Sequence, residues 1–454
     1  MACTRRGLRV DDELRRSRLR ALTTQAETLQ VEAQPLIEAL KDKLKRPALY
    51  FKSSVCKSCR NGKKKRVGCA ACAGVGKFER FECNLGSDHQ LKDILYNALR
   101  LPARSRGGSI TTDEEALQSL VALDKSGLVM LALRYAKLAT MAEIYGRIAP
   151  APDGHVRTVM NPAGTYTFRF SHKEAFYVSH STNLSNLPNV EAKRHALYNV
   201  RDCIVPDAGE VFIEGDLSAA DSRSVACLSD DELLLQMFRE NRDVHKFTAV
   251  NVLGVSEANV TKVQRDVIGK VTRHAGSFGE GWNSLMRRIN GMADLTGLTA
   301  TPKQAKEWSA NFQTLHPNLD NVWWNRVERT LLRGEPMRAF TGQTCQFYPR
   351  IDDAGNLDAD TLRAAIAWEP QYNTSMLAKM ALLDMFRGEA NGWRVLLDSH
   401  DAVLLGVPKA NVHRAARALK RAMERRIVVN NHELTIPAEV FVCKERWSSK
   451  ERLL

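Results

Sequence analysis

Two short acidic segments constrain the fold of this chain more than any other feature, because each follows an apolar run typical of a buried strand. Asp216 follows the run at residues 211–213, and Asp401 follows the run at residues 395–397. Carboxylates at the ends of adjacent strands supply the oxygen ligands that Mg²⁺ prefers. The sequence therefore predicts a sheet in which two distant strands meet, with both aspartates close enough to hold a pair of divalent cations.

Each aspartate taken alone also has a local explanation. Asp216 precedes a predicted helix, where an aspartate often caps the N-terminus. His400 and Asp401 lie at the tip of a predicted hairpin, where turns favour aspartate for reasons of backbone conformation. The pair is more informative than either residue, because two metal ions bridged by two carboxylates activate an attacking hydroxyl and stabilise a leaving oxygen.

A basic and aromatic stripe lies about midway between the two acidic segments. Lys270, His274, Phe278 and Trp282 recur every four residues, which places them on one face of a predicted helix, and Arg273 flanks this stripe. Cations at one end and aromatic rings at the other suit a nucleotide, which has phosphates at one end and a base at the other. The alternative is an exposed basic helix face with buried aromatic residues, and the periodicity is compatible with both.

Three glycines, Gly276, Gly279 and Gly281, interrupt the same predicted helix. A glycine inside a helix costs roughly 1 kcal/mol relative to alanine. We expect these glycines to let a base pair approach the backbone closely.

The composition favours a polyanionic partner and argues against a membrane protein. The 454 residues carry a formal net charge of +14, which favours binding to nucleic acid. Residues 41–80 contain thirteen Lys or Arg but only two acidic residues, although such a run is also compatible with a solvated face. No apolar run approaches the ~20 residues of a membrane span, and the N-terminal residues lack a secretion signal. We therefore expect a cytoplasmic protein of two or three domains.

Four of the ten cysteines form two Cys-x-x-Cys pairs inside this basic segment, Cys56 with Cys59 and Cys69 with Cys72. Each pair presents two sulfurs to one ion, so the four together match a tetrahedral structural Zn²⁺ site. In a cytosolic protein zinc is favoured over disulfides. The alternative is an unmetallated or redox-active pair.

The pattern of apolar residues predicts a mixed α+β chain without internal repeats. Most of residues 217–335 are expected to be helical, and residues 394–407 are expected to form a hairpin. Further helices are expected at 7–45, 91–148, 357–387 and 409–425, with extended pieces at 156–213, a small β excursion at 336–355 and a short β segment ending at Val442.

Taken together, these segments resemble the family A DNA polymerases, the family of bacterial DNA polymerase I and of many phage replicative enzymes. Further segments extend the resemblance in the family's order, at residues 167–171, 183–188, 200–206, 243–249, 363–371 and 436–440. The resemblance is continuous from about residue 81 to residue 448, and a weaker similarity reaches back to residues 7–11.

The resemblance implies an α+β right-hand polymerase with a thumb, a palm built on an antiparallel sheet, and helical fingers. The implied thumb comprises residues 1–52 and 81–150, the palm residues 151–250 and 351–454, and the fingers residues 251–350. The cysteine pairs then belong to a zinc-ribbon-like insertion at residues 53–80 that grips duplex phosphate or a partner protein.

The resemblance also implies a role for each candidate residue. Asp216 and Asp401 would bind two Mg²⁺ ions with the Leu217 carbonyl as a third ligand. Lys270 and His274 would neutralise the nucleotide triphosphate as catalytic cations. Further nucleotide contacts are implied for Asp221, His245, Arg273, Phe278 and Trp282, and DNA contacts for Arg169, Arg223, Arg363, Gln371 and His400.

The implied activity is template-directed DNA synthesis on primer–template DNA, in which the primer 3′-hydroxyl attacks the α-phosphate of an incoming deoxynucleoside triphosphate. We see no exonuclease region before residue 7 and therefore expect that this chain does not proofread, so that either a separate exonuclease does so or the protein tolerates errors. A processivity factor is a further expected partner. The expected location is the cytoplasm of a bacterial host cell, if a phage encodes the protein.

Several residues depart from the family pattern. His274 replaces a lysine, which predicts weaker or pH-dependent neutralisation of the triphosphate. Asp221 replaces the sugar-gating glutamate and is one methylene shorter, which predicts weaker exclusion of ribonucleotides. The other departures are Trp282 for a tyrosine, Ala402 for a glutamate, and Ala219 and Ala367 for amides that contact the duplex.

Three alternative functions stay open at this stage. They are a DNA-binding descendant that has lost catalysis, an RNA-synthesising relative, and a zinc-ribbon nucleic-acid binder that is not an enzyme. The presence of both aspartates argues against the first. Phe278 and the segment at 183–188 favour a DNA enzyme over the second, although Asp221 leaves that choice open. The third explains residues 41–80 and nothing after residue 150.

Overall fold

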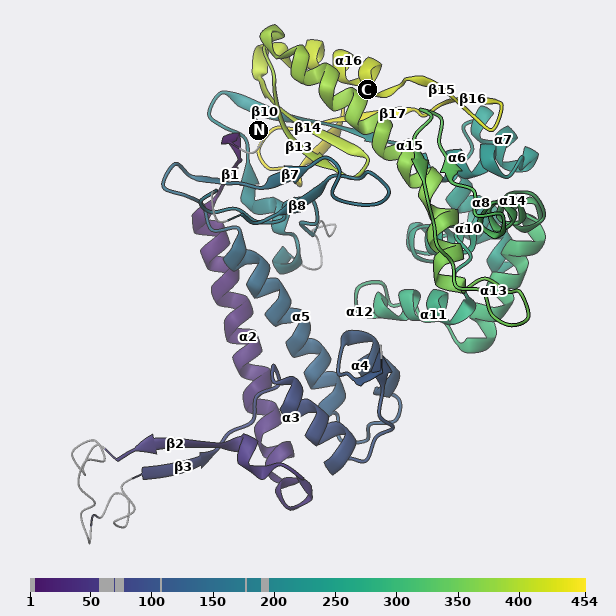
Figure 1. Cartoon of the computed structure of the whole chain (residues 1–454). Coiled ribbons are helices and arrows are strands. Elements are labelled where there is room, and N and C mark those ends of the chain that lie inside the picture. Colours follow the sequence, from purple (N-terminus) through teal and green to yellow (C-terminus); the bar gives the residue numbers. More distant parts are fainter. Residues whose placement is uncertain (1–4, 57–68, 70–76, 107, 176–177, 189–195) are drawn as a thin grey trace. The chain divides into compact units, whose positions relative to one another are not determined.

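The computed structural model describes residues 5–56, 69, 77–106, 108–175, 178–188 and 196–454 (Figure 1). The chain divides into two compact units. Unit 1 comprises Met1–Asp12 and Arg147–Leu454, and unit 2 comprises Glu13–Gly146. The finer division into thumb, palm, fingers and an insertion stays a prediction. Among the described residues, no helix is both long and apolar enough to cross a membrane.

Unit 2 is built on two long helices, α2 (Asp12–Glu38) and α5 (Leu128–Arg147). The predicted helix at 7–45 is wrong at both ends. Residues Leu8–Val10 form β1, because they pair in unit 1 with β6 (His155–Val156) and β9 (Ile204–Val205). The shorter elements of this unit are η1 (Lys41–Lys43), η2 (Pro47–Tyr50), α3 (Asp88–Lys92), η4 (Asp93–Ala98), β4 (Ser105–Arg106), β5 (Ser109–Ile110) and α4 (Glu114–Leu120).

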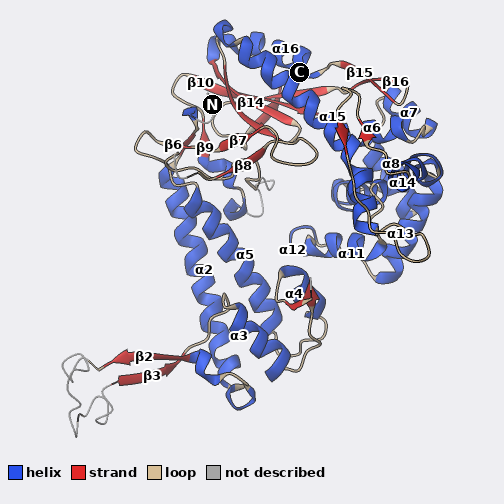
Figure 2. Cartoon of the chain, viewed as in Figure 1, coloured by secondary structure: helices blue, strands red, loops and turns tan. Residues whose placement is uncertain are grey.

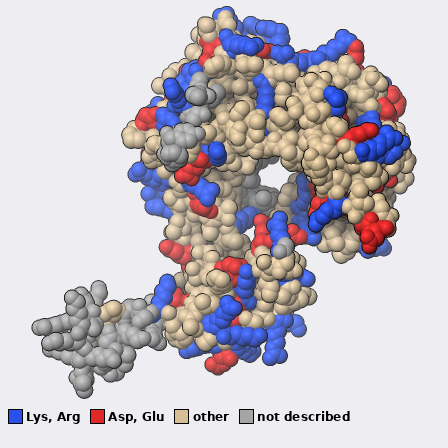
Figure 3. Space-filling model, viewed as in Figure 1, with Lys and Arg blue, Asp and Glu red and all other residues tan. Residues whose placement is uncertain are grey.

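A hairpin extends from unit 2 and carries the cysteine-rich segment. Its strands are β2 (Phe51–Val55) and β3 (Lys77–Phe81), paired from Phe51 opposite Phe81 to Val55 opposite Lys77. Lys and Arg side chains gather on the visible face of this unit (Figure 3). The exposed cations beside the hairpin are Lys41, Lys43, Lys45, Arg46 and Lys52.

The centre of unit 1 is a five-stranded antiparallel sheet in the order β13-β14-β10-β17-β18. Figure 2 labels two of its strands, β10 and β14. The strands are β10 (Glu210–Leu217), β13 (Arg394–Ser399), β14 (Ala402–Pro408), β17 (Ala438–Cys443) and β18 (Lys450–Arg452). The predicted hairpin at 394–407 is confirmed as β13 and β14. A Cβ at Gly215 would lie 2.5 Å from the Met423 sulfur, so only glycine lets helix α16 (Val412–Met423) pack this closely on β10.

A mainly helical region follows β10 in the sequence, as predicted for 217–335. Its longer helices are α6 (Ala220–Leu228), α7 (Glu232–Arg239), α8 (Val244–Leu253), α10 (Lys270–Ser277), α11 (Trp282–Gly291), α13 (Pro302–Leu315) and α14 (Asn325–Leu332). The predicted β excursion is the short hairpin of β11 (Met337–Arg338) and β12 (Thr344–Cys345). The chain then returns to the sheet through α15 (Ala359–Arg387), and a further hairpin of β15 (Arg426–Val429) and β16 (His432–Thr435) follows α16.

Candidate active site

The two aspartates singled out by the sequence lie at the ends of neighbouring strands. Asp216 is on β10, directly opposite Ala402 on β14, and Asp401 immediately precedes Ala402. The Leu217 amide donates a hydrogen bond to the Asp401 carbonyl at 3.2 Å. The turn before Asp401 is tight, since His400 adopts a left-handed conformation with φ of 64°. The predicted meeting of the two distant strands is confirmed.

Both carboxylates lie in a partly buried, negatively charged environment. Burial raises the pKa of Asp216, and the charges of Asp401 and Glu214 raise it further. Burial also raises the pKa of Asp401. Glu214 is already paired, because its carboxylate accepts hydrogen bonds from the Trp447 indole at 2.7 Å and from the Lys450 ammonium at 2.8 Å. A cation between Asp216 and Asp401 would therefore relieve unfavourable charge.

The donor set at this strand end fits Mg²⁺. Asp216 and Asp401 supply carboxylate oxygens, and Leu217 supplies a backbone carbonyl on the same strand end. Mg²⁺ sites commonly use few protein ligands and leave positions for phosphate oxygens and water. Within the described ranges, no group of three or more His, Cys, Asp or Glu side chains forms a more complete metal site.

Asp398 is a buried carboxyl that the sequence did not distinguish from an ordinary turn residue. It lies on β13 three residues before Asp401 and is 3 % exposed. Burial raises its pKa to about 8, with the charge of Lys379 acting in the opposite direction. These surroundings favour the uncharged form of Asp398, and we assign it no metal.

The predicted basic and aromatic stripe is divided between two helices. Lys270 and His274 lie exposed on α10, but this helix ends at Ser277, and Trp282 begins α11. The prediction of one continuous helix is wrong because Gly279 has a φ of 68°, which breaks the helical path. Phe278 is 6 % exposed and packs edge-on against the rings of His274 and Trp323.

Gly276 has a packing reason that the sequence did not indicate, and so has the preceding Gly269, whereas the expectation for Gly279 and Gly281 stays a prediction. A Cβ at Gly276 would lie 2.2 Å from the Phe312 ring of α13. A Cβ at Gly269 would lie 2.1 Å from the His245 carbonyl of α8. The expectation that Gly276 makes room for a base pair is therefore wrong, because the space is needed by Phe312.

Two of the three candidate phosphate-binding cations are histidines that favour the neutral form. Partial burial, followed by the nearby Arg288 charge, lowers the pKa of His274. Burial and the charges of Arg273, Arg265 and Lys270 lower the pKa of His245 to about 3. Lysine is charged at neutral pH, so Lys270 is the one of these three candidates that carries a positive charge.

Arg273 does not face the stripe, and its predicted nucleotide contact is wrong in this structure. Its side chain is 1 % exposed and turns into the helical region. The guanidinium Nε donates to Thr248 Oγ1 at 2.9 Å and to the Val244 carbonyl at 3.3 Å, and Nη2 lies 3.2 Å from His316 Nε2. Packing of α10 against α8 and α13 on this side removes Arg273 from the surface.

Asp221, at the start of α6, is held by two side chains. Thr374 Oγ1 on α15 donates to its carboxylate at 2.7 Å, and Arg169 Nη2 lies 3.4 Å from its other oxygen. Sequence reasoning missed Thr374, although its position three residues after Gln371 on a predicted helix places both residues on neighbouring parts of one face. The structure thus brings Asp221 and Arg169 together, and their roles in nucleotide and DNA contact stay predictions.

The remaining candidate DNA contacts are distributed around these groups. His400 Nε2 lies 2.9 Å from Asn186 Oδ1, which brings the segment at 183–188 to the turn that carries Asp401. Gln371 is half-buried on α15. Arg363, also on α15, lies beside Gly279 and pairs with Asp360 at 2.5 Å.

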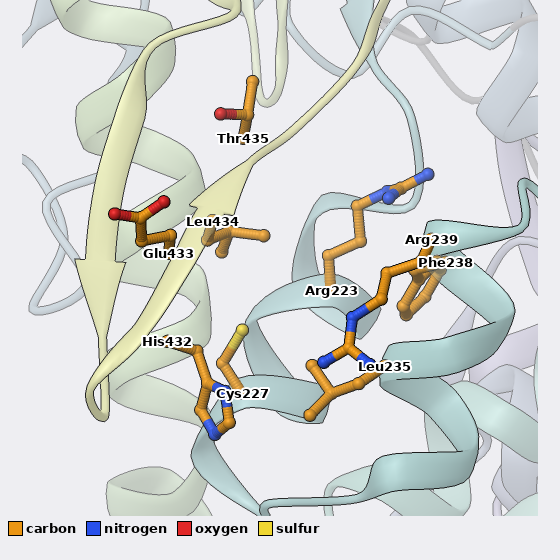
Figure 4. Close-up of a pocket in the computed structure, with 9 residues that line it drawn as sticks. All are labelled: Arg223, Cys227, Leu235, Phe238, Arg239, His432, Glu433, Leu434 and Thr435. Carbon is orange, nitrogen blue, oxygen red and sulfur yellow. The ribbon is translucent and has the colours of Figure 1, made fainter.

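Arg223 lies apart from this cluster, in a cavity of about 380 Å³ between α6, α7 and β16 (Figure 4). Its guanidinium stacks over the Phe238 ring at 4.4 Å from the ring centroid, and its Nε donates to the Ser218 carbonyl at 3.1 Å. Arg239 and His432 also line the cavity. The predicted DNA contact of Arg223 stays a prediction.

Of the four predicted zinc ligands, the described residues include two. Cys56 is buried, and its sulfur lies 4.0 Å from the sulfur of Cys69. Cys59 and Cys72 lie outside the described residues. The zinc site stays a prediction.

Unit 1 thus combines a five-stranded antiparallel sheet, with Asp216 at the end of β10 and Asp401 in the turn before β14, and a helical region that exposes cations. The chain belongs to DNA polymerase family A, whose family model matches residues 69–448. This match confirms the resemblance expected from the sequence.

Similar proteins agree with this assignment. The chain is 27 % identical over 387 residues to the thermostable DNA polymerase I of Thermus aquaticus, covering 81 % of this chain and 42 % of that protein. It is 26 % identical over 356 residues to the DNA polymerase I of Caldicellulosiruptor bescii, covering 76 % of this chain and 39 % of that protein. The chain thus spans about two fifths of the length of these relatives.

A solved structure confirms the fold class. The POL domain of Pol1 from M. smegmatis, in complex with DNA primer-template and dNTP, superimposes with a TM-score of 0.73 at 18 % identity. The similarity covers 98 % of this chain and 68 % of that one. The α+β right-hand polymerase fold predicted from the sequence is therefore confirmed.

Proposed function

We propose that the chain is a template-directed DNA polymerase that adds deoxynucleotides to a primer 3′-hydroxyl. The observation that carries the proposal is the placement of Asp216 and Asp401 at the ends of paired strands β10 and β14. Membership of DNA polymerase family A supports it. The catalytically inactive alternative is disfavoured, because both carboxylates are present and lie at the ends of paired strands.

We propose that Asp216, Asp401 and the Leu217 carbonyl hold two Mg²⁺ ions. Bound there, the ions would activate the primer hydroxyl and stabilise the leaving pyrophosphate oxygen. The raised pKa of both carboxylates and their open coordination support this assignment.

The other side chains would orient the primer, template and nucleotide. Lys270 and, when protonated, His274 would attract the triphosphate from the exposed face of α10. His245 on α8 would approach the same phosphates, while Phe278 and Trp282 would contact the sugar, base or template. Contacts with primer–template DNA are assigned to Arg169, Arg223, Arg363, Gln371 and His400.

The first test is extension of a labelled primer on a DNA template with Mg²⁺, comparing the wild type with Asp401→Ala. Deoxynucleotides and ribonucleotides are supplied in separate reactions. We expect extension with deoxynucleotides that disappears in the variant. Tight binding of primer–template without any extension by the wild type would contradict the proposed activity and favour a DNA-binding protein.

A ribonucleotide-tolerant or RNA-synthesising enzyme is the second candidate, favoured by one observation. Asp221, at the sugar-gating position, is short and is drawn towards α15 by Thr374. The ribonucleotide reactions above decide between the two polymerases. Rates with ribonucleotides that equal those with deoxynucleotides would replace the first proposal by the second.

We propose further that Cys56, Cys59, Cys69 and Cys72 bind one structural Zn²⁺ ion. The 4.0 Å between the sulfurs of Cys56 and Cys69 supports this, because two sulfurs at ~2.3 Å from one tetrahedral ion lie about 3.8 Å apart. We expect about one zinc per chain by elemental analysis, and none after Cys56→Ser with Cys69→Ser.

The zinc ribbon is proposed to grip duplex phosphate or a processivity factor, because exposed cations surround the hairpin that carries it. Deleting residues 56–72 should shorten the product of each binding event and leave addition of a single nucleotide unchanged. Loss of both would mean that the segment is needed for folding. We place this activity in the cytoplasm of a bacterial cell, with a phage as the proposed source.

A further inference from the structure

Arg273 joins the two helices that carry the candidate phosphate-binding cations. His245 lies on α8, and Lys270 and His274 lie on α10. Arg273 also lies on α10, and its Nε donates to Thr248 Oγ1 on α8 at 2.9 Å. This hydrogen bond therefore joins α10 to α8, the two helices that carry the candidate phosphate-binding residues.

Arg273 is the first member of a buried chain of hydrogen bonds. Its Nη2 lies 3.2 Å from His316 Nε2, and His316 Nδ1 lies 2.6 Å from Asp231 Oδ2. A neutral histidine that accepts at Nε2 donates at Nδ1, so His316 receives a bond from Arg273 and gives one to Asp231. Both Arg273 and His316 are 1 % exposed, and Asp231 is 5 % exposed.

The members of this chain belong to four different helices or their caps. Asp231 caps α7 by accepting from the Leu234 amide at 3.0 Å, and His316 caps the end of α13. The Arg273 guanidinium lies 5.5 Å from the centroid of the Phe312 ring of α13. Turning or sliding α10 would break several of these buried bonds together, and buried polar groups without partners are costly.

We propose that Arg273, His316 and Asp231 are positioning residues that fix the direction in which Lys270 and His274 face the triphosphate. The inference rests on the proposed polymerase activity. If these three residues have a purely structural role, disrupting their hydrogen bonds should lower the stability of the fold and nothing else. Positioning predicts that nucleotide affinity falls even in a variant whose stability is kept.

The main test is the triple variant Arg273→Met, His316→Leu and Asp231→Ser. It removes all three polar partners together, so no buried charge is left unpaired, and serine still caps α7. Replacing a buried ionic cluster by apolar side chains of similar volume is often neutral or stabilising. We expect a melting temperature close to that of the wild type, unchanged affinity for primer–template DNA, and about tenfold weaker binding of the next complementary deoxynucleotide.

Nucleotide binding is measured on a primer that ends in a dideoxynucleotide, so the measurement does not require turnover. His316→Gln is the conservative variant, because its amide can donate to Asp231 and accept from Arg273. It should retain more nucleotide affinity than His316→Leu. Arg446→Met is the control, since Arg446 pairs with Asp11 and contacts neither α8 nor α10 through any described hydrogen bond.

The outcomes separate this inference from the proposed activity. A folded triple variant that binds the deoxynucleotide as tightly as the wild type overturns the positioning role, even if primer extension is normal. A wild type that forms the ternary complex but does not extend the primer overturns the activity and leaves positioning intact. If the triple variant does not fold, equal nucleotide affinity in His316→Gln and His316→Leu overturns the inference.

Discussion

The acidic edge of the sheet and the basic face of α10 are held in place by different means. Backbone hydrogen bonds between β10 and β14 fix Asp216 and Asp401. Side-chain packing behind α10 fixes Lys270 and His274, and the surroundings of His274 lower its pKa. The carboxylate side is therefore set by strand register, whereas the cationic side is open to adjustment by substitution and pH. We expect variants of the first region to abolish activity and variants of the second to reduce it by degrees.

The largest effect is expected for Asp216→Asn. The amide keeps the shape of the carboxylate but removes its charge, so several kcal/mol of transition-state stabilisation should be lost, which corresponds to a fall of about 10³-fold in single-turnover extension. Thermal stability without metal should rise, because burial and Asp401 disfavour the charge at this position. Asp384→Asn, which removes the partner of Arg425, is the control and should keep full activity. Activity of Asp216→Asn within tenfold of the wild type would contradict the expectation that variants of the acidic region abolish activity.

The next effect is expected on α10, where Lys270→Gln should lower kcat/KM for the deoxynucleotide by about 10²-fold. His274→Gln should lower it less than tenfold at pH 8, because His274 is then mostly neutral. His274→Lys should raise kcat/KM above that of the wild type, since it adds a charge that the surroundings do not remove as easily. Steady-state kinetics on one primer–template measures all three. Equal losses in the two glutamine variants would contradict the assigned difference in charge.

The two regions also differ in how much of them the sequence predicts. The pairing of β10 with β14 could be predicted from local patterns. Each of two apolar runs must be buried and is followed by an aspartate, so burying the runs in one sheet brings the two aspartates together. The end of α10 at Ser277 does not, since the four-residue spacing continues past Gly279 to Trp282. A regular four-residue spacing in the sequence therefore does not show that the backbone stays helical throughout.

Arg273 and Thr374 show a second limit of the sequence. Arg273 lies beside the stripe in the sequence, but its burial depends on α8 and on His316, which is distant in the chain. Thr374 is linked to the site only by its hydrogen bond to Asp221, which is distant in the sequence. Residue type and spacing in the sequence identify the side chains expected to contact substrate. The side chains that position them can be identified only from the tertiary packing.

A smaller effect is expected from pH. The folded pKa of His274 is lowered from the ordinary 6.5, so His274 gains its proton, and its attraction for phosphate, only as the pH falls below the usual histidine range. The ratio of wild-type to His274→Lys affinity for the deoxynucleotide should therefore rise several-fold as the pH falls from 7 to 5. Taking the ratio removes changes shared by both proteins, such as protonation of the triphosphate. A ratio that is flat with pH would show that His274 does not meet the phosphates.

The smallest effect concerns the choice between deoxyribose and ribose, where the two regions meet. Asp221 starts α6 just after the acidic strand end, and its carboxylate is held by Thr374 at 2.7 Å and by Arg169 at 3.4 Å. Because a glutamate reaches one methylene further, Asp221→Glu should lower ribonucleotide insertion relative to deoxynucleotide insertion by several-fold. Thr374→Val removes one hydrogen bond, worth about 0.5–1.5 kcal/mol, and should change the same ratio by about twofold to tenfold.

Thr374→Ser keeps the hydroxyl and serves as the matched control, with the wild-type ratio expected. The ratio is measured from single insertions of matched ribo- and deoxynucleotides on one template. If Thr374→Val changes the ratio and Thr374→Ser does not, the hydroxyl acts on sugar choice through the Asp221 carboxylate. If Asp221→Glu leaves the ratio unchanged, the carboxylate does not meet the sugar. Discrimination would then have to come from the side of α10, through the packing of Phe278 against His274 and Trp323.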